Sequence, residues 1–362
     1  MIIYISMLGV LGLFYILNNS GVPNLKLNDN TKPNKVFAFI VFAYIVFWAG
    51  IRSGFVDTGT YIEQFNNSSW DTLSTLDFSF NSGWGFRLAE IIFKQLISSN
   101  YHAWLMFIAI ISGACVATTF YKYSQNYFYS VFLFIATTDF TWLMNGIRQF
   151  LVVAILFAAT PLIENNKWFK YILLVLLCST IHGTALIMIP IYFIVRSKPW
   201  KANTMILLFG VLFILFFTSS FTNLLEETLA ETKYENIGDQ FLEDDGVNPI
   251  RVLVFSVTTI FAFLARKNLP ETDIKINIFV NMSVLTSGLY LIAMATSGIL
   301  LGRLPIYTQL YQYMLLPYVI DKLFENKTKD LVYVASIILF LIYFIIATRG
   351  FYYISDLTGI LV

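Results

Sequence analysis

The chain has 362 residues, of which 57% are hydrophobic and only 12% are charged. A soluble globular protein carries about 25% charged residues, so water could not solvate the surface of this chain. The formal net charge of +1 gives no reason to expect a nucleic-acid partner. The composition therefore excludes an ordinary soluble domain and predicts an integral membrane protein.

Apolar stretches of helical length recur along the whole sequence. A helix needs about 20 apolar residues to cross a hydrocarbon core of about 30 Å. Hydropathy predicts about twelve such spans in chain order: 2–18, 34–52, 102–122, 127–144, 147–164, 168–181, 182–197, 203–221, 250–266, 274–297, 303–321 and 331–348.

The stretch 83–99 is a weaker candidate, because it is short and contains Arg87, Glu90 and Lys94. We interpret it as a re-entrant or interfacial helix within an outer loop that covers residues 53–101. The predicted fold class is all-α, a polytopic transmembrane helical bundle that forms one domain over residues 1–362.

Lysines and arginines predict the orientation of this bundle. If 83–99 does not span and the N-terminus is outside, the cytoplasmic loops contain 13 Lys and 2 Arg, whereas the outer side contains 2 Lys and 6 Arg. Because cytoplasmic loops carry an excess of basic residues, we expect both termini outside. The outer arginines are Arg52, Arg87, Arg148, Arg251, Arg303 and Arg349.

These outer arginines oppose the orientation trend, and most lie at or near a predicted helix end. One interpretation is that they are ordinary side chains reaching from the helix ends to the interface. However, that explanation does not account for the preference for Arg over Lys. The forked guanidinium is suited to phosphate, and basic groups at membrane depth are functional candidates.

Two outer segments concentrate the polar residues. The first begins around Arg52 and contains Asp57 and Tyr61, which would share a face of a short helix because they are four residues apart. The second, 222–249, is acidic and amphipathic. It is either a solvated charged loop or a lid over an outer cavity.

Single residues suggest the chemistry. Asp57 is the best candidate for a general base, since it lies near Arg52 in the sequence. Arg148 follows an Asn-Gly turn between two spans, and His182 lies at the next outer hinge, where it either caps a helix end or contacts substrate. Arg87 and Glu90 are three residues apart and could pair with each other.

Metal and cofactor motifs are not evident in the sequence. There are two histidines, and Cys115 and Cys178 lie in separate apolar runs, so a transition-metal site is not expected. We predict no cofactor, and leave open a divalent cation such as Mg²⁺ bound by carboxylates.

Several motifs resemble one family. Gly50-Ile-Arg52-Ser-Gly, Asp57-Thr-Gly-Thr-Tyr61, Asn145-Gly-Ile-Arg148-Gln149 and Ile181-His182-Gly-Thr resemble the EpsG-like, Wzy-type bacterial polysaccharide polymerases, which serve exopolysaccharide, capsule or O-antigen synthesis. The resemblance covers residues from about 37 to 200. The C-terminal half matches in layout more than in motif.

The resemblance implies a multi-pass protein of the bacterial plasma membrane with its active site facing outside or the periplasm. Such an enzyme joins oligosaccharide repeat units carried on undecaprenyl pyrophosphate, and both donor and acceptor are lipid-linked. Membrane lipid would surround it, and a flippase and a chain-length regulator are further expected partners. Arginines would then stabilise the charge that develops on the pyrophosphate leaving group.

From this resemblance we expect Asp57, Arg148 and His182 to be catalytic, and Arg52, Arg148, Arg251 and Arg303 to clamp the pyrophosphate. The remaining expected substrate-binding residues are Tyr61, Arg87, Gln149 and Arg349.

Two other classes of protein stay open. A flippase for lipid-linked oligosaccharides should place charges along a cavity at mid-depth, whereas here they gather near outer helix ends. The second class is another membrane transferase, such as an O-antigen ligase, which uses the same donor, or a polysaccharide O-acetyltransferase.

Overall fold

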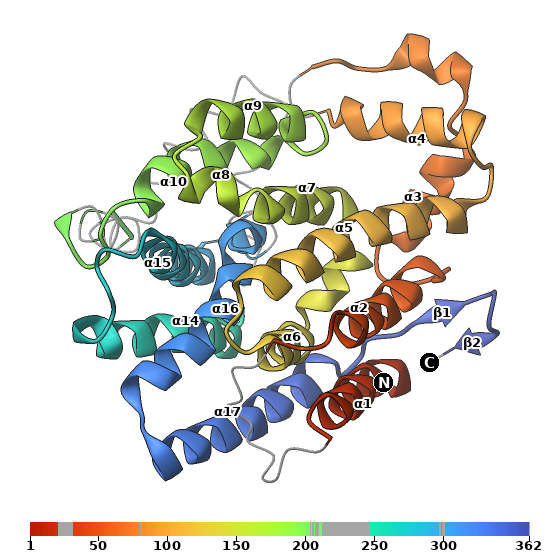
Figure 1. Ribbon diagram of the computed structural model, residues 1–362. Helices are drawn as coiled ribbons and strands as arrows, with labels where there is room; N and C mark the ends of the chain where they lie inside the picture. Colours follow the sequence, from red (N-terminus) through yellow and green to blue (C-terminus); the bar gives the residue numbers. More distant parts are fainter. Residues whose placement is uncertain are drawn as a thin grey trace. The chain divides into compact units, whose positions relative to one another are not determined.

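The computed structural model describes residues 1–20, 32–79, 82–202, 204, 206, 210, 211, 246–296, 298 and 301–361. These residues are almost all helical, which confirms the predicted all-α class (Figure 1). The chain divides into two compact units, which are described separately. Unit 1 contains Met1–Ile189 and Asn326–Val362, and unit 2 contains Pro190–Glu325.

Unit 1 contains most of the elements, with 3₁₀ helices labelled η. Its elements are α1 Ile2–Asn18, α2 Lys35–Gly50, α3 Thr58–Asn66, η1 Trp70–Thr75, α4 Trp84–Leu96, α5 Tyr101–Tyr123, α6 Tyr127–Ala136, η2 Asp139–Leu143, α7 Ile147–Ala158, α8 Thr160–Glu164, α9 Trp168–Ser179, η3 Gly183–Ile187, α17 Asn326–Ala347, and the antiparallel strands β1 Ile354–Ser355 and β2 Ile360–Leu361. Helix α10, Met188–Val195, begins at the boundary of the two units.

Unit 2 continues with the helices of the C-terminal half. They are α14 Pro249–Leu264, η4 Ala265–Lys267, α15 Ile274–Ala295, η5 Leu301–Arg303 and α16 Ile306–Leu323. Its interior contains buried polar side chains that bond to one another or to the backbone. For example, Gln312 Nε2 donates to Phe255 O at 2.8 Å, and Tyr290 donates to Gln309 at 2.7 Å.

Within the described residues, four helical segments are long and apolar enough to cross a membrane: Tyr101–Tyr123, Pro249–Lys267, Ile274–Ala295 and Asn326–Ala347. Shorter apolar helices occupy most of the other predicted spans. The number of spans and their orientation stay predictions. The predicted span 203–221 lies mostly outside the described residues.

Two predicted spans are broken into shorter pieces. The stretch 127–144 is helical only to Ala136 before a 3₁₀ turn, because Thr138 has a left-handed backbone with φ of 67°. The stretch 147–164 divides into α7 and α8, where Pro161 lacks the N–H that a continuous helix would use. Hydropathy detected the apolar character of both stretches and missed these breaks.

Aromatic packing joins the three helices α3, α4 and α5. The ring centroid of Trp104 on α5 lies 6.3 Å from that of Phe65 on α3. It lies 5.4 Å from the ring centroid of Phe86 and 5.2 Å from that of Phe93, both on α4. Each ring is well buried. Such pairs add about 0.5–1.5 kcal/mol each beyond their burial, so the cluster fixes α3 and α4 against α5.

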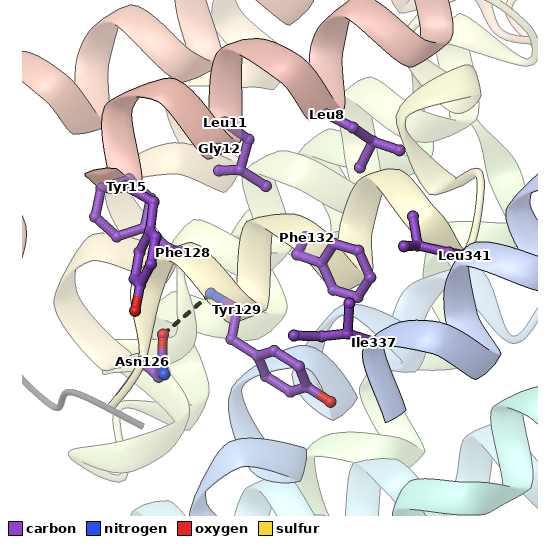
Figure 2. A pocket seen from close by; sticks show the side chains of 10 residues that line it. All are labelled: Leu8, Leu11, Gly12, Tyr15, Asn126, Phe128, Tyr129, Phe132, Ile337 and Leu341. Carbon is purple, nitrogen blue, oxygen red and sulfur yellow. Dashed lines mark hydrogen bonds between the residues drawn. The ribbon is translucent and has the colours of Figure 1, made fainter. Parts of the chain in front are cut away.

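An apolar cavity of about 240 Å³ lies between α1, α6 and α17 (Figure 2). Its lining includes Leu8, Leu11, Phe132, Ile337 and Leu341. Its mainly apolar lining is suited to hydrocarbon rather than to polar chemistry.

Helices α2 and α5 pack closely because small residues face the neighbouring helix. A Cβ added at Gly50 would come within 2.9 Å of the Cα of Met106, and one at Gly113 would collide with Val46. Small residues allow helix backbones to approach each other in membrane proteins.

We expect Gly50→Ala to destabilise the protein by about 1–3 kcal/mol, because the backbone of Met106 cannot move away as a flexible side chain could. Thermal unfolding in detergent would measure the loss. Gly9→Ala on α1 is the control, because its Cβ would meet nothing within 4 Å. Equal melting temperatures for the two variants would contradict this close packing.

Candidate functional site

Arg52 follows the end of α2 and is fully buried. Its Nε donates to Thr58 Oγ1 at 3.0 Å, and its Nη1 donates to the carbonyl of Ala49. Burial lowers the pKa of Arg52 to about 10, while nearby Asp57 acts in the opposite direction. The group therefore stays charged at neutral pH. In the described part of the chain, its Nη2 atom has no hydrogen-bond partner.

Asp57 connects the start of α3 to the start of α7. Its Oδ2 accepts a hydrogen bond of 3.0 Å from the N–H of Gly146, which precedes α7. Gly146 has φ of 64°, a left-handed backbone that glycine adopts without strain. Burial raises the pKa of Asp57, against the opposing effects of Gly146 and Arg52. Among the described residues, Asp57 Oδ1 has no hydrogen-bond partner.

Tyr61 joins Asp57 to Arg148. It lies one turn after Asp57 on α3, as predicted, and its hydroxyl interacts with both the Asp57 carboxylate and the Arg148 guanidinium. Burial raises the pKa of Tyr61 to about 12, so the phenol stays protonated at neutral pH. Arg148 is in the first turn of α7, and its Nη1 atom lies beside Gly83, just before α4.

Glu90 forms a second polar cluster beside this group. The carboxylate is fully buried and pairs with Arg87, as the spacing predicted, at 2.8 Å. Ser68 donates to its Oε1 at 2.6 Å and Gln64 to its Oε2 at 3.1 Å. Burial raises the pKa of Glu90, and Arg148 is among the cations that oppose the rise. Arg87 is therefore held by a carboxylate.

The hinge that carries His182 docks on the start of α4. The N–H of Gly85 donates to the carbonyl of Thr180 at 2.9 Å. His182 is half-buried at the start of η3, and its Nδ1 is 2.8 Å from Thr184 Oγ1. This contact is typical of a residue at a helix end, and a role in substrate contact stays a prediction.

The remaining predicted site residues are divided between the units. In unit 1, Gln149 is buried and Arg349 is exposed. In unit 2, Arg251 lies over the rings of Tyr290 and Phe255, with its guanidinium carbon 5.5 and 5.8 Å from their centroids, and Arg303 is exposed. Of the four arginines of the predicted clamp, Arg52 and Arg148 belong to unit 1 and Arg251 and Arg303 to unit 2, and the clamp itself stays a prediction.

The second outer segment was predicted over 222–249. Residues 222–245 lie outside the described residues, so its amphipathic character and its role as a lid stay predictions.

Residues 51–57 connect α2 to α3 and are called the Arg52 loop. The sequence did not predict the hairpin near the C-terminus that supports this loop. The N–H of Ser53 donates to the carbonyl of Ile354 at 2.8 Å, and the N–H of Ile354 donates to the carbonyl of Gly54 at 2.9 Å. Ser355 also donates to the carbonyl of Ile51 at 2.8 Å. Strands this short leave no alternating pattern that hydropathy could detect.

Asp356, in the turn of this hairpin, fastens it to the start of α5. Its Oδ1 is 2.8 Å from His102 Nε2, and its Oδ2 accepts a 2.7 Å hydrogen bond from Tyr101. The hydrogen bond from Tyr101 lowers the pKa of Asp356, with His102 adding to the effect. The carboxylate is therefore charged at neutral pH.

The arrangement in unit 1 provides two kinds of chemistry. Arg52, Arg148 and the N-terminus of α7 supply positive charge suited to an oxyanion such as phosphate. Asp57 supplies a carboxylate with one oxygen held by the backbone. Within the described residues, no three His, Cys, Asp or Glu side chains gather in a group that could hold a metal ion.

We expect Asp356→Ala to loosen the hairpin and the Arg52 loop together. Loss of the bonds to Tyr101 and His102 should speed exchange of the Ser53 and Gly54 amides by about tenfold, measured by hydrogen–deuterium exchange. Leu357→Ala is the control, since that side chain is 60% exposed. Unchanged exchange in Asp356→Ala would show that other contacts hold the loop.

A model of the EpsG family matches residues 35–357, which is nearly the whole chain. No curated protein and no solved structure matches it. The chain therefore belongs to the EpsG family, whose members are exopolysaccharide-polymerase-type membrane proteins.

Proposed function

We propose that the protein polymerises oligosaccharide repeat units carried on undecaprenyl pyrophosphate at the outer face of the bacterial plasma membrane. The family membership supports the reaction class. The observation that carries the proposal is the cluster of Arg52, Asp57, Tyr61 and Arg148, in which a buried guanidinium keeps one nitrogen without a partner among the described residues. Such a group fits an anionic leaving group better than a neutral sugar.

The helix ends of unit 1 support a site on one side of the membrane. The end of α2 and the starts of α5 and α7 are connected through Asp57, Asp356 and the hairpin. The charge pattern of the loops predicts that this side is the outer one. The donor and acceptor would then both reach the cluster from the outer leaflet.

The proposed reaction is a direct displacement. An acceptor hydroxyl oxygen forms a bond to the anomeric carbon of the donor, and the bond from that carbon to the pyrophosphate oxygen breaks. The electron pair of the broken bond goes to the pyrophosphate, where Arg52, Arg148 and the N-terminus of α7 stabilise the added charge. The hydroxyl proton goes to Asp57.

Asp57 is suited to this proton transfer in two respects. Its Oδ2 is held by Gly146, so the carboxylate is oriented and Oδ1 is the oxygen that would take the proton. Its raised pKa makes it a stronger base than an exposed carboxylate. Tyr61, which stays protonated, would move its O–H hydrogen bond from Asp57 to phosphate or sugar when substrate binds.

We expect Arg148→Lys to lower the turnover of purified protein on lipid-linked repeat units by about 100-fold. Lysine retains the charge and loses the fork that contacts two oxygens at once. The measurement is the length and amount of polymer formed. Arg196→Lys, outside the cluster, is the control and should leave both unchanged.

Long polymer at the normal rate from Arg148→Lys would contradict the role of this arginine. If both variants lose activity with lower melting temperatures, the result would report folding, so the comparison uses only variants that melt like the natural protein.

The pH dependence of the polymerisation rate tests whether Asp57 acts as the base. Because burial raises its pKa, the rate should fall as the pH drops through a value above the ordinary carboxyl range, where the base becomes protonated. Asp57→Asn should remove this acid limb along with most of the activity. Asp71→Asn, an exposed carboxylate of the same outer loop, should keep both. A pH profile unchanged by Asp57→Asn would exclude Asp57 as the base.

A further inference from the structure

Unit 2 contains a cavity of about 540 Å³ that the proposed reaction does not use. It lies where the end of α14 and η4 meets the start of α15, and residues 199–201 close one side. Its size is within the range of pockets that hold small ligands.

Basic side chains surround this cavity. Lys201, Arg266 and Lys267 line it, and each is exposed. Glu271 also lines it and lies 3.3 Å from Lys201 and 3.4 Å from Lys198. One carboxylate against these cations leaves the cavity positively charged, so it fits an anion.

Two buried polar atoms of the lining have no hydrogen-bond partner among the described residues. One is Oδ1 of Asn277, whose side chain donates through Nδ2 to the carbonyl of Glu271 at 2.9 Å. Asn277 is only 4% exposed. The other is the indole Nε1 of Trp200, whose ring packs against Phe263 at 5.2 Å. Buried polar atoms normally have hydrogen-bond partners. These two therefore indicate a bound group that accepts a hydrogen bond from Trp200 Nε1 and donates one to Asn277 Oδ1.

The position of the cavity indicates the source of the anion. The segments Pro249–Lys267 and Ile274–Ala295 are both long and apolar enough to span a membrane, and the cavity lies at the connection between them. Such a connection lies at the level of the lipid headgroups. Phe263 and Leu264 are exposed just before the basic residues, so an apolar surface continues toward the hydrocarbon. Trp200 is also a residue type that is enriched at this level.

We propose that this cavity binds the phosphate-bearing headgroup of an anionic phospholipid. The phosphate contacts Lys201, Lys267 and Arg266, the indole N–H of Trp200 donates to an oxygen of the headgroup, and the acyl chains lie along the exposed face of α14. Basic pockets beside membrane helices recognise anionic headgroups in this way. The proposal does not depend on the proposed polymerase reaction, because none of its residues is among those expected to contact the pyrophosphate or the sugar.

The test uses the full-length protein in detergent, with native mass spectrometry and thermal unfolding as readouts. The probes are short-chain phosphatidylglycerol, phosphatidylcholine of the same chain length, and inorganic phosphate. We expect the natural protein to bind phosphatidylglycerol about tenfold more tightly than phosphatidylcholine. Lys201→Gln with Lys267→Gln should remove this preference, a loss of about tenfold or more.

The matched control is Lys327→Gln with Lys329→Gln at the start of α17, which removes the same charge outside the cavity. It should keep the preference for phosphatidylglycerol. Trp200→Phe keeps the ring and deletes the N–H, and should weaken phosphatidylglycerol binding by about fivefold. Melting temperatures without lipid identify variants that still fold.

Three results would overturn the proposal. The first is equal binding of the two lipids by the natural protein. The second is an equal loss of preference in both double variants, which would reflect overall charge. The third is stabilisation by inorganic phosphate as strong as that by phosphatidylglycerol, which would assign the cavity to a free anion.

Discussion

The buried positive charge of Arg52 is the constraint on which the arrangement of α3 and the start of α7 depends. Removing a guanidinium from water costs several kcal/mol unless other groups compensate it. Here the compensation comes from the carbonyl of Ala49, the hydroxyl of Thr58 and the charge of Asp57. Because Asp57 also binds the backbone of Gly146, the requirement of one buried cation sets the position of α7 and thus of Arg148.

Two kinds of contact hold α3 and α4 in place. The aromatic cluster around Trp104 fixes α3 and α4 without directional bonds, and the buried Glu90 adds hydrogen bonds that are strongly directional. The apolar cluster supplies most of the stabilisation, since the hydrophobic free energy is roughly proportional to the apolar area that is buried. The polar cluster specifies which rotation of α4 is allowed, because the Glu90 carboxylate has to face Ser68 and Gln64.

The local parts of the site could be predicted from the sequence. Asp57 and Tyr61 share a helix face, and Arg87 pairs with Glu90, because spacing along a helix determines both. The contact of Asp57 with Gly146 could not be predicted, since it joins residues 89 positions apart. The break at Thr138 was also hidden, because hydropathy measures polarity and is insensitive to backbone handedness. Whether Arg251 and Arg303 contribute depends on the arrangement of two units, and spacing along the chain contains no information about it.

The C-terminal hairpin has a consequence for the way the protein is made. Ser355 bonds to Ile51, a residue 304 positions earlier, and Ile354 pairs with Gly54. If the helices enter the membrane in the order of synthesis, the Arg52 loop is in place long before its partner strand has been made. Contacts between such distant positions form slowly, because a large loop has to close first. Translation products that stop before Ile354 would therefore enter the membrane with an Arg52 loop that lacks the support of this strand.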